Sequence, residues 1–491
     1  MKIFLKSHIE RWALAYILSV AAILRLVQLG KRDFWVDEAF TGIAIRESWS
    51  GMMTILTHDV HPPLYYFGAK LLSSAFSYSI IGIRLYSVVF GILCVYMVYL
   101  IARELYGTRA GKIAALISAI APFAIQYSQE ARMYTQYAFC ILVAIYFLSR
   151  SCNSPRKIYP ILWGLALGLG ILTQYIALIF VPIFVLIILI WKKEGSYQPG
   201  TRIRNIVIGL AVMSVIIAPW TSHAIDQYKR MEDGFSWTTI PQVADIMNTA
   251  TSFILGAAPG GLSQGQIAPA YHLQGVNKNV TGIAVLALIL LAGGMLLRHK
   301  RHKAIPILLL IILPPATLYV LSHGDHSYYV SRYLIPVSFS LYILLGAWIA
   351  GLKPRLAYIA IVVYLAGIAL TARLPVETAW NAFAHANTGQ KNYYALNPFD
   401  YVIAKYYVGA DHLTLFNVDN PNERPVWWAA IGESLVSTSN PHDLVTRPDP
   451  VITFLPLHIS QKVPTSLSSV EFDIIDSFGT LYLVRPRASN E

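Results

Sequence analysis

The chain has 491 residues, of which 56% are hydrophobic and only 13% are charged, and its mean hydropathy is +0.52. About a quarter of the residues of a soluble globular domain are charged, so this composition excludes an ordinary soluble fold and predicts an integral membrane protein. The formal net charge of +12 does not indicate a nucleic-acid partner, because the basic residues lie in short turns between apolar runs.

Apolar segments recur along the first three quarters of the chain. A helix that crosses a bilayer needs about 20 apolar residues, and the pattern predicts an all-α polytopic membrane domain over residues 1–373 with about eleven transmembrane helices. The candidate spans are Trp12–Leu29, Ile80–Ala102, Ile113–Tyr127, Thr135–Ser149, Ile158–Gln174, Ile176–Trp191, Ile206–Thr221, Val280–Leu297, Ile305–Ser322, Leu334–Ala350 and Leu356–Ala372.

The charges in the turns predict the orientation of these helices. Every second turn is basic, beginning with Lys2, Lys6 and Arg11 before the first helix. The positive-inside rule places these turns in the cytoplasm, so the N-terminus lies inside and an odd number of spans leaves the C-terminus outside. The predicted outer segments are the first outer loop 30–79, the loops 128–134, 222–279 and 323–333, and everything after residue 373.

Two outer regions have structure of their own. Trp49–His58 and Pro63–Phe76 have helical apolar spacing but are too short to span, which predicts amphipathic helices in the membrane interface. From about Asn387 the composition becomes that of a soluble protein, and we expect a small extracytoplasmic α/β domain over residues 374–491. Its predicted elements are a helix over Pro398–Tyr407 and strands over His412–Val418, Val451–Leu455, Phe472–Ile475 and Thr480–Val484.

The first outer loop carries adjacent carboxylates, Asp37 and Glu38, after the aromatic pair Phe34 and Trp35. One such carboxylate can take a proton from an acceptor while the other binds a hydroxyl, an amine or a metal. Ionisable groups at the end of a spanning helix indicate a functional site, so both residues are catalytic candidates. The alternative is a solvated pair on a loop.

Asp59, His61 and Tyr65 form a second group in the same loop. An extended segment places Asp59 and His61 on one face, where a carboxylate and an imidazole can hold an anionic substrate or a divalent cation. No other cofactor is indicated. Alternatively, His61 caps the helix that begins at Pro63, and the tyrosines belong to an aromatic belt at the interface.

Two later outer turns supply cations. Glu130 and Arg132 lie in the tight turn 128–134, and Arg332 lies at the start of a late helix. A guanidinium can form a fork of hydrogen bonds to a phosphate, so this group is the candidate site for a donor phosphate. An internal Glu130–Arg132 pair is the alternative. A second metal hypothesis, with weak spacing, involves His323, Asp325 and His326.

Carboxylates for proton abstraction and arginines for phosphate, all on the outer side, fit transfer from a lipid-phosphate donor. The lipid tail would lie in the bilayer while the phosphate leaves toward the arginines. No glycine-rich nucleotide-binding motif is present on the cytoplasmic side, which agrees with a donor that is not a nucleotide sugar.

Four motifs in this order resemble a known family. They are W-x-D-E at residues 35–38, H-D-x-H-P-P-L-Y-Y at 58–66, S-Q-E-A-R-M-Y at 128–134 and S-R-Y-L-x-P at 331–336. The chain resembles the membrane type-C glycosyltransferases, which include the protein O-mannosyltransferases and the lipid A aminoarabinose transferases. The resemblance covers roughly Met1–Ala350.

The resemblance implies a polyprenyl-phosphate sugar donor, inversion at the anomeric carbon, and a catalytic carboxylate that falls on Asp37 with Glu38 in support. It also implies Arg132 and Arg332 as ligands of the donor phosphate. Where the aminoarabinose transferases have Glu-Lys-Pro-Pro, this chain has Val60–Pro63, with the acid displaced to Asp59.

The predicted function is therefore an inverting glycosyltransferase of the cytoplasmic membrane with its active site on the extracytoplasmic side. Its expected partners are a polyprenyl-phosphate-linked sugar, membrane lipid, and an acceptor that is a protein, a lipid or a glycan. A lipid-linked glycan polymerase or ligase is the first alternative. A lipid or sugar transporter is the second, and it would place charges within the spans and show inverted repeats.

Overall fold

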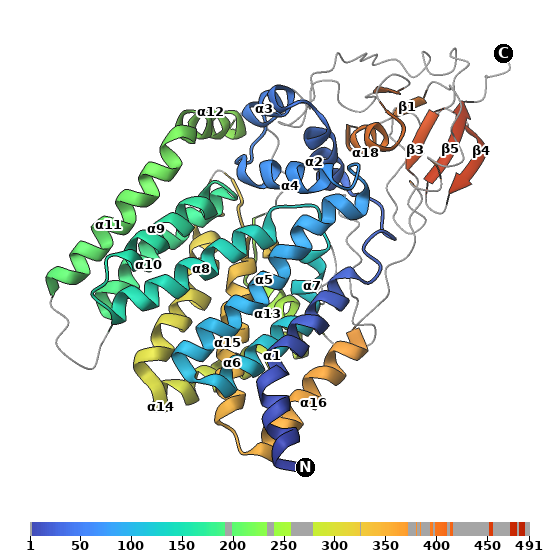
Figure 1. Cartoon of the computed structure of the whole chain (residues 1–491). Coiled ribbons are helices and arrows are strands. Elements are labelled where there is room, and N and C mark those ends of the chain that lie inside the picture. Colours follow the sequence, from blue (N-terminus) through green and yellow to red (C-terminus); the bar gives the residue numbers. More distant parts are fainter. Residues whose placement is uncertain are drawn as a thin grey trace.

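The computed structural model describes residues 2–191, 199–232, 240–256, 278–324, 326–371, 380, 383, 393–395, 398–409, 413–415, 451–454, 472–478 and 481–486. Within this part, long helices form a bundle, shorter helices lie across one end of it, and a small sheet lies beside the short helices (Figure 1). The polar chemistry is collected at the end of the bundle that the short helices cover.

The bundle helices follow the apolar runs, because in lipid the backbone polar groups of a spanning segment must be satisfied within its own helix. They are α1 (Lys2–Leu26), α5 (Ile80–Tyr106), α6 (Thr108–Ile120), α7 (Pro122–Ser128), α8 (Tyr134–Asn153), α9 (Ile158–Ile171), α10 (Phe180–Ile190), α11 (Pro199–Ile217), α13 (Val243–Leu255), α14 (Lys278–Leu321), α15 (Ile335–Gly351) and α16 (Pro354–Thr371), with 3-10 turns η1 (Tyr175–Ile179), η2 (Ala218–Trp220) and η3 (Ser331–Leu334).

Several of these helices are long and apolar enough to cross a membrane. Among the described residues, five meet that criterion by length and composition, and the bent pair α6 and α7 makes a sixth if the two form one span. Further apolar helices are shorter, at 10–17 residues. The chain is thus a multi-pass, mostly helical membrane protein, whereas about eleven spans with the N-terminus inside stays a prediction.

Three spans differ from their predicted form. The predicted span Ile113–Tyr127 is broken, because α6 and α7 meet at an angle of 60°. Pro122 begins α7 and has no N–H to continue the hydrogen-bond ladder of α6. The predicted spans Val280–Leu297 and Ile305–Ser322 are continuous within α14 except for a kink at Lys300, where φ is −143° and ψ is 47°.

Arg25 explains how the break after α6 is tolerated. Its guanidinium donates to the carbonyls of Ser118 and Ala119, at 3.2 and 2.9 Å, and to the Ser128 hydroxyl at 3.1 Å. The last carbonyls of a helix have no partner within the helix and carry its negative dipole end. The buried cation in α1 therefore satisfies the end of α6, which gives this charge within an apolar helix a structural role.

Short helices cover the polar end of the bundle. The two predicted in the first outer loop are present as α3 (Trp49–His58) and α4 (Leu64–Ser74). They follow α2 (Val36–Arg46), which the sequence analysis does not anticipate, and α12 (Thr221–Glu232) lies beside α3 (Figure 1). Asp37 and Glu38 occupy the first turn of α2, where carboxylates stabilise the positive end of the helix dipole.

The C-terminal portion contains a five-stranded sheet in the order β2-β1-β3-β5-β4. Strand β1 pairs in parallel with β2 and β3, and β5 pairs antiparallel with β3 and β4. Helix α18 (Pro398–Val408) and the last four strands overlap the predicted helix and strands. The strands are β1 (Tyr393–Ala395), β2 (Leu413–Leu415), β3 (Val451–Phe454), β4 (Phe472–Phe478) and β5 (Leu481–Pro486). An extracytoplasmic domain over 374–491 stays a prediction.

Helix α18 packs on α2 through tyrosines and one carboxylate. The Tyr407 hydroxyl accepts from the Phe34 N–H at 2.9 Å and donates to Asp33 Oδ1 at 3.4 Å. The Tyr406 ring lies so close to Gly42 that a Cβ there would be 2.5 Å from it. The C-terminal portion thus holds the segment that leads into Asp37.

Replacing Tyr407 with Phe is expected to loosen this docking. The change removes the acceptor of the buried Phe34 N–H, and an unsatisfied buried donor costs about 1–3 kcal/mol. Hydrogen exchange at the Phe34 amide should accelerate. Tyr358→Phe on α16, whose side chain is 70% exposed, is the control. Equal protection of Phe34 in the wild type and the Tyr407→Phe variant would contradict the assigned contact.

Candidate active site

The carboxylates of the predicted outer turns differ in their access to solvent. Asp37 is 29% exposed, whereas the other three are nearly inaccessible: Glu38 at 0%, Asp59 at 1% and Glu130 at 4%. Among these four groups, only Asp37 can meet an acceptor without a rearrangement. Its Oδ2 lies 3.9 Å from Nη2 of Arg132.

Glu38 does not share a site with Asp37, which corrects the expectation of a cooperating carboxylate pair. Both of its oxygens accept from Arg84, at 2.8 Å each, and Oε1 also accepts from the Ala131 N–H at 2.7 Å. Burial opposes its ionisation, but the Arg84 guanidinium holds the pKa of Glu38 below its usual value. Adjacent residues on a helix point about 100° apart, so the two side chains diverge. Through the Ala131 N–H, Glu38 holds the turn that carries Arg132.

The sequence analysis does not name Arg84 as a site residue, although a charged residue in an apolar helix indicates a specific partner. Besides Glu38, it donates to the carbonyls of Leu29, Arg32 and Asp33, at 2.8, 2.6 and 3.0 Å. The buried Glu38–Arg84 pair therefore joins the segment before α2 to the turn that carries Arg132.

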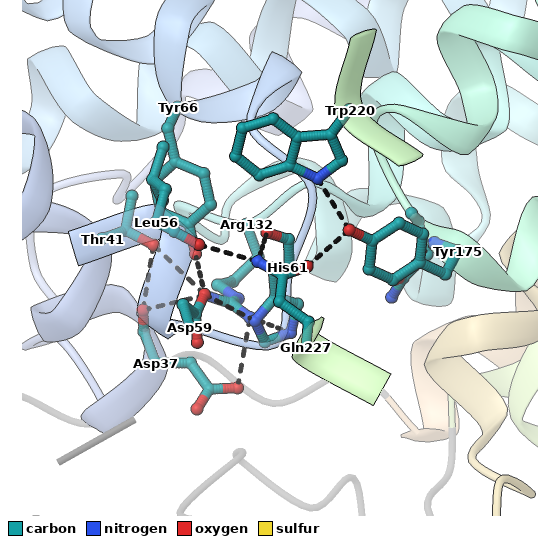
Figure 2. A network of polar contacts seen from close by, with 11 residues as sticks. Asp37, Thr41, Leu56, Asp59, His61, Tyr66, Arg132, Tyr175, Trp220 and Gln227 are labelled. Carbon is teal, nitrogen blue, oxygen red and sulfur yellow. Dashed lines mark hydrogen bonds and ion pairs between the residues drawn. The ribbon is translucent and has the colours of Figure 1, made fainter. Parts of the chain in front are cut away.

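Arg132 is the centre of the polar network (Figure 2). Its Nη1 donates to the Asp37 carbonyl, the Thr41 hydroxyl and the Tyr66 hydroxyl, all at 3.3 Å. Its Nη2 donates to Nε2 of His61 at 3.0 Å. The alternative, an internal pair with Glu130, is absent from the ion pairs of the described residues, and Arg132 contacts Asp37 and His61 instead.

Asp59 and His61 come together as predicted, with His61 Nδ1 3.0 Å from Asp59 Oδ2. Because Nε2 accepts from Arg132, Nδ1 must carry the proton and donate it to Asp59. Burial opposes the charge on Asp59, but His61 and Arg132 hold its pKa below the usual value. His61 does not cap the following helix, because Asp59 and Arg132 engage both of its ring nitrogens and the N-cap residue of α4 is Pro63.

Tyr66, and not Tyr65, belongs to the network. The Tyr66 hydroxyl accepts from Arg132 and donates to Asp59 Oδ2 at 3.4 Å. Tyr65 points away: its hydroxyl is 3.0 Å from that of Ser87, which donates to the Arg132 carbonyl at 3.1 Å. In a helix these neighbours face different sides, and the sequence pattern YY does not say which faces the site.

A second arm of the network comes from segments far along the chain, which sequence reasoning missed. Trp220 Nε1 donates to the Tyr175 hydroxyl at 2.8 Å, and that hydroxyl donates to Gln227 Oε1 at 2.5 Å. Gln227 in turn donates to the Leu56 carbonyl at 2.7 Å (Figure 2). The arm attaches α12 to the segment that carries Asp59 and His61.

Arg332 lies near the start of α2, among aromatic rings. Its Cζ is 5.4 Å from the ring centroid of Trp35, 5.9 Å from that of Tyr134 and 5.7 Å from that of Tyr333. Trp35 is the N-cap residue of α2 and stands two positions before Asp37. Arg132 and Arg332 thus both lie near the start of α2.

A divalent cation does not fit Asp59 and His61 as they stand. Both nitrogens of His61 are engaged, and the group facing Nε2 is the cationic guanidinium of Arg132. Within the described ranges no three His, Cys, Asp or Glu side chains gather as a metal site. In the second metal hypothesis, Nδ1 of His323 is 2.8 Å from the Tyr319 carbonyl, and Asp325 lies outside the described residues.

Comparison with known proteins extends this description. Residues 60–223 match the family model of dolichyl-phosphate-mannose-protein mannosyltransferases. Over 228 residues the chain is 24% identical to undecaprenyl phosphate-alpha-4-amino-4-deoxy-L-arabinose arabinosyl transferase 2 of Pseudomonas fluorescens (strain Pf0-1), a match that covers 43% of this chain and 40% of the relative. The match thus spans less than half of that relative's length.

Solved structures share the fold. ArnT from Cupriavidus metallidurans in the apo state has a TM-score of 0.64 at 13% identity, over 97% of this chain and 98% of that one. The oligosaccharyltransferase of Archaeoglobus fulgidus in the apo form has a TM-score of 0.54 at 14% identity, over 82% and 64%.

The family model and the shared fold confirm the resemblance to the type-C membrane glycosyltransferases. The chain is similar in fold to ArnT of Cupriavidus metallidurans over 97% of its length, and in sequence to the mannosyltransferase family model over residues 60–223.

Proposed function

We propose that this protein is an inverting glycosyltransferase that moves a sugar from a polyprenyl-phosphate donor to an acceptor at the outer face of the cytoplasmic membrane. The observation that carries the proposal is that Asp37, the one accessible carboxylate of the four, lies 3.9 Å from the buried Arg132. A base for the acceptor and a cation for the leaving phosphate thus adjoin each other.

In the proposed reaction, Asp37 accepts the proton of the acceptor hydroxyl as its oxygen attacks the anomeric carbon. The bond from that carbon to the phosphate oxygen breaks on the opposite face, the phosphate keeps the electron pair, and the configuration inverts. Arg132 and Arg332 stabilise the developing charge on the phosphate. Arg132 Nε is buried and has no hydrogen-bond partner in the described part of the chain, so it is a donor left for a ligand.

The donor class is supported by two relatives of the same fold. One structure of Cupriavidus metallidurans ArnT holds undecaprenyl phosphate, and one of the Archaeoglobus fulgidus enzyme holds an inhibitory peptide and a dolichol-phosphate. The basic turns between the apolar runs support the outer location of the site. The acceptor is a protein, a lipid or a glycan.

The proposal is tested by incubating the purified protein with polyprenyl-phosphate sugars and candidate acceptors. Mass spectrometry should detect free polyprenyl phosphate together with one sugar added to an acceptor. Consumption of a lipid diphosphate donor would instead identify a polymerase or ligase. Movement of an unchanged lipid-linked sugar across a vesicle membrane, without cleavage, would identify a transporter.

Arg132→Lys is expected to lower kcat/KM about 10- to 100-fold, because hydrogen bonds to charged groups contribute about 1.5–3 kcal/mol. A lysine keeps the charge but cannot contact the α2 groups and His61 at the same time. Steady-state kinetics across donor concentrations checks this. Arg46→Lys, at the far end of α2, is the control, and similar kinetics for Arg132→Lys and the wild type would contradict the assigned contacts.

A further inference from the structure

Glu130 is a carboxyl close to Arg132 and Arg332, the two arginines that we assign to the donor phosphate. It stands two residues before Arg132 in the turn between α7 and α8, and only 4% of it is exposed. An ionised carboxylate at this place would repel the phosphate that the arginines attract. A neutral carboxylic acid would not, and it could donate a hydrogen bond.

The position of Glu130 is fixed by the chain around it. The next residue, Ala131, donates its N–H to Glu38, and Glu38 is held by Arg84. Arg84 also donates to the Arg32 carbonyl at 2.6 Å, so the turn of Glu130 and the segment of Arg32 are attached to one buried ion pair. The backbone at Glu130 is therefore held in this region.

One oxygen of Glu130 is available to a ligand. Oε1 accepts from Gln126 Nε2 at 3.4 Å, whereas the buried Oε2 has no hydrogen-bond partner among the residues that the structure describes. Arg32 Nη2 and Trp35 Nε1 are likewise buried without a partner within those ranges. Buried polar atoms in proteins are nearly always satisfied, so this set points to a polar ligand near the start of α2.

The charged and titratable groups that act on Glu130 come from three parts of the chain. They are Arg32 and Glu38 from the segment around the start of α2, Arg332 from η3, and Tyr127 from α7. Burial raises the pKa of Glu130 to about 7; Arg32 and Arg332 oppose that change and Glu38 adds to it. Burial therefore outweighs both cations, and a bound phosphate would favour the protonated form further.

We propose that Glu130 keeps a proton and, through Oε2, donates a hydrogen bond to the phosphate of the lipid-linked donor. This inference rests on the proposed function. As the bond between the anomeric carbon and the phosphate oxygen breaks, the phosphate gains a second negative charge, and the hydrogen bond from Glu130 stabilises that charge without transfer of the proton. Polyprenyl phosphate leaves with both charges, and Asp37 holds the acceptor's proton until solvent removes it.

Two variants separate this role from that of an ionised partner of the arginines. Glu130→Gln keeps an N–H donor and cannot ionise, so kcat/KM at pH 6 should stay within about fivefold of the wild type, whereas Glu130→Ala should lose about 10- to 100-fold. In the wild type, kcat/KM should fall as the pH rises through about 7, where Glu130 loses its proton, and Glu130→Gln should lack that fall. Glu104→Gln is the matched control. Glu104 lies at the end of α5 opposite to Arg84 and forms a partly exposed ion pair with Arg150.

A second measurement does not depend on turnover. Infrared difference spectra of the intact protein between pH 6 and pH 8.5 should contain a protonated carboxyl band that Glu130→Gln removes and Glu104→Gln retains. Absence of that difference, or a Glu130→Gln variant as impaired as Glu130→Ala at pH 6, would overturn the inference. If the wild type consumes no polyprenyl-phosphate sugar, the proposed function fails, and the infrared band still decides the protonation of Glu130.

Discussion

Asp37→Asn is expected to lower kcat for sugar transfer by about 10²- to 10⁴-fold, the range that general-base catalysis contributes. The amide is nearly isosteric with the carboxylate but cannot accept the proton of the acceptor hydroxyl. Arg132 contacts the backbone carbonyl of Asp37 and the Thr41 hydroxyl, and the exchange leaves both groups in place. The variant should therefore fold and bind the lipid donor.

The measurement is the initial rate of polyprenyl phosphate release with a labelled donor, together with donor affinity. Asp226→Asn is the matched control, because Asp226 is an exposed carboxylate on α12, outside the hydrogen-bond network described. A rate for Asp37→Asn within about threefold of the wild type, with the lipid donor bound normally, would remove Asp37 from the mechanism.

Arg84→Met and Glu38→Met are each expected to lower the free energy of unfolding by about 3–5 kcal/mol, because each leaves its partner as an unpaired buried charge. The pair has 1% and 0% side-chain exposure, so solvent screening does not weaken it. Either change should also displace Arg132, because Glu38 accepts a hydrogen bond from the N–H of Ala131, the residue directly before Arg132.

The double variant tests the separate contribution of Arg84. Replacing both charges should restore part of the stability, but three carbonyls before α2 also lose their donor, so recovery should be incomplete. Denaturant titration in mixed micelles supplies the four free energies of the cycle. Arg150→Met in the partly exposed Glu104 pair should cost about 1 kcal/mol or less. Equal losses at the two pairs would contradict the buried-pair assignment.

The relation between Asp37 and Glu38 illustrates the limit of motif reading. Two adjacent acids in an outer loop indicated a site, but the same motif is compatible with a cooperating pair and with two separate functions. Helix α2 decides between them, because it turns one carboxylate outward and the other toward Arg84. Helix formation there depends on packing against α4 and α18, which lie downstream, so the motif alone does not predict it.

Asp59 and His61 were easier to predict, because residues two apart in an extended segment share a face. Their partner was not predicted: Arg132 is 71 residues beyond His61, and only the packing of the helices brings its guanidinium within 3.0 Å of Nε2. The same reason explains why Tyr175, Trp220 and Gln227 were missed. They come from η1, η2 and α12, and no local pattern relates them to the first outer loop.

The amino-acid sequence by itself determined the membrane class, most of the helical segments, the helices α3 and α4, and the turns in which polar groups gather. These properties follow from hydropathy, spacing and turn charge, which are local. Tertiary structure alone decided that α6 and α7 meet at a bend capped by Arg25, that Glu38 supports the site from within, and that Asp37 remains accessible beside Arg132. Such relations depend on which side chains the packed helices bury against each other, and burial is set by the whole fold.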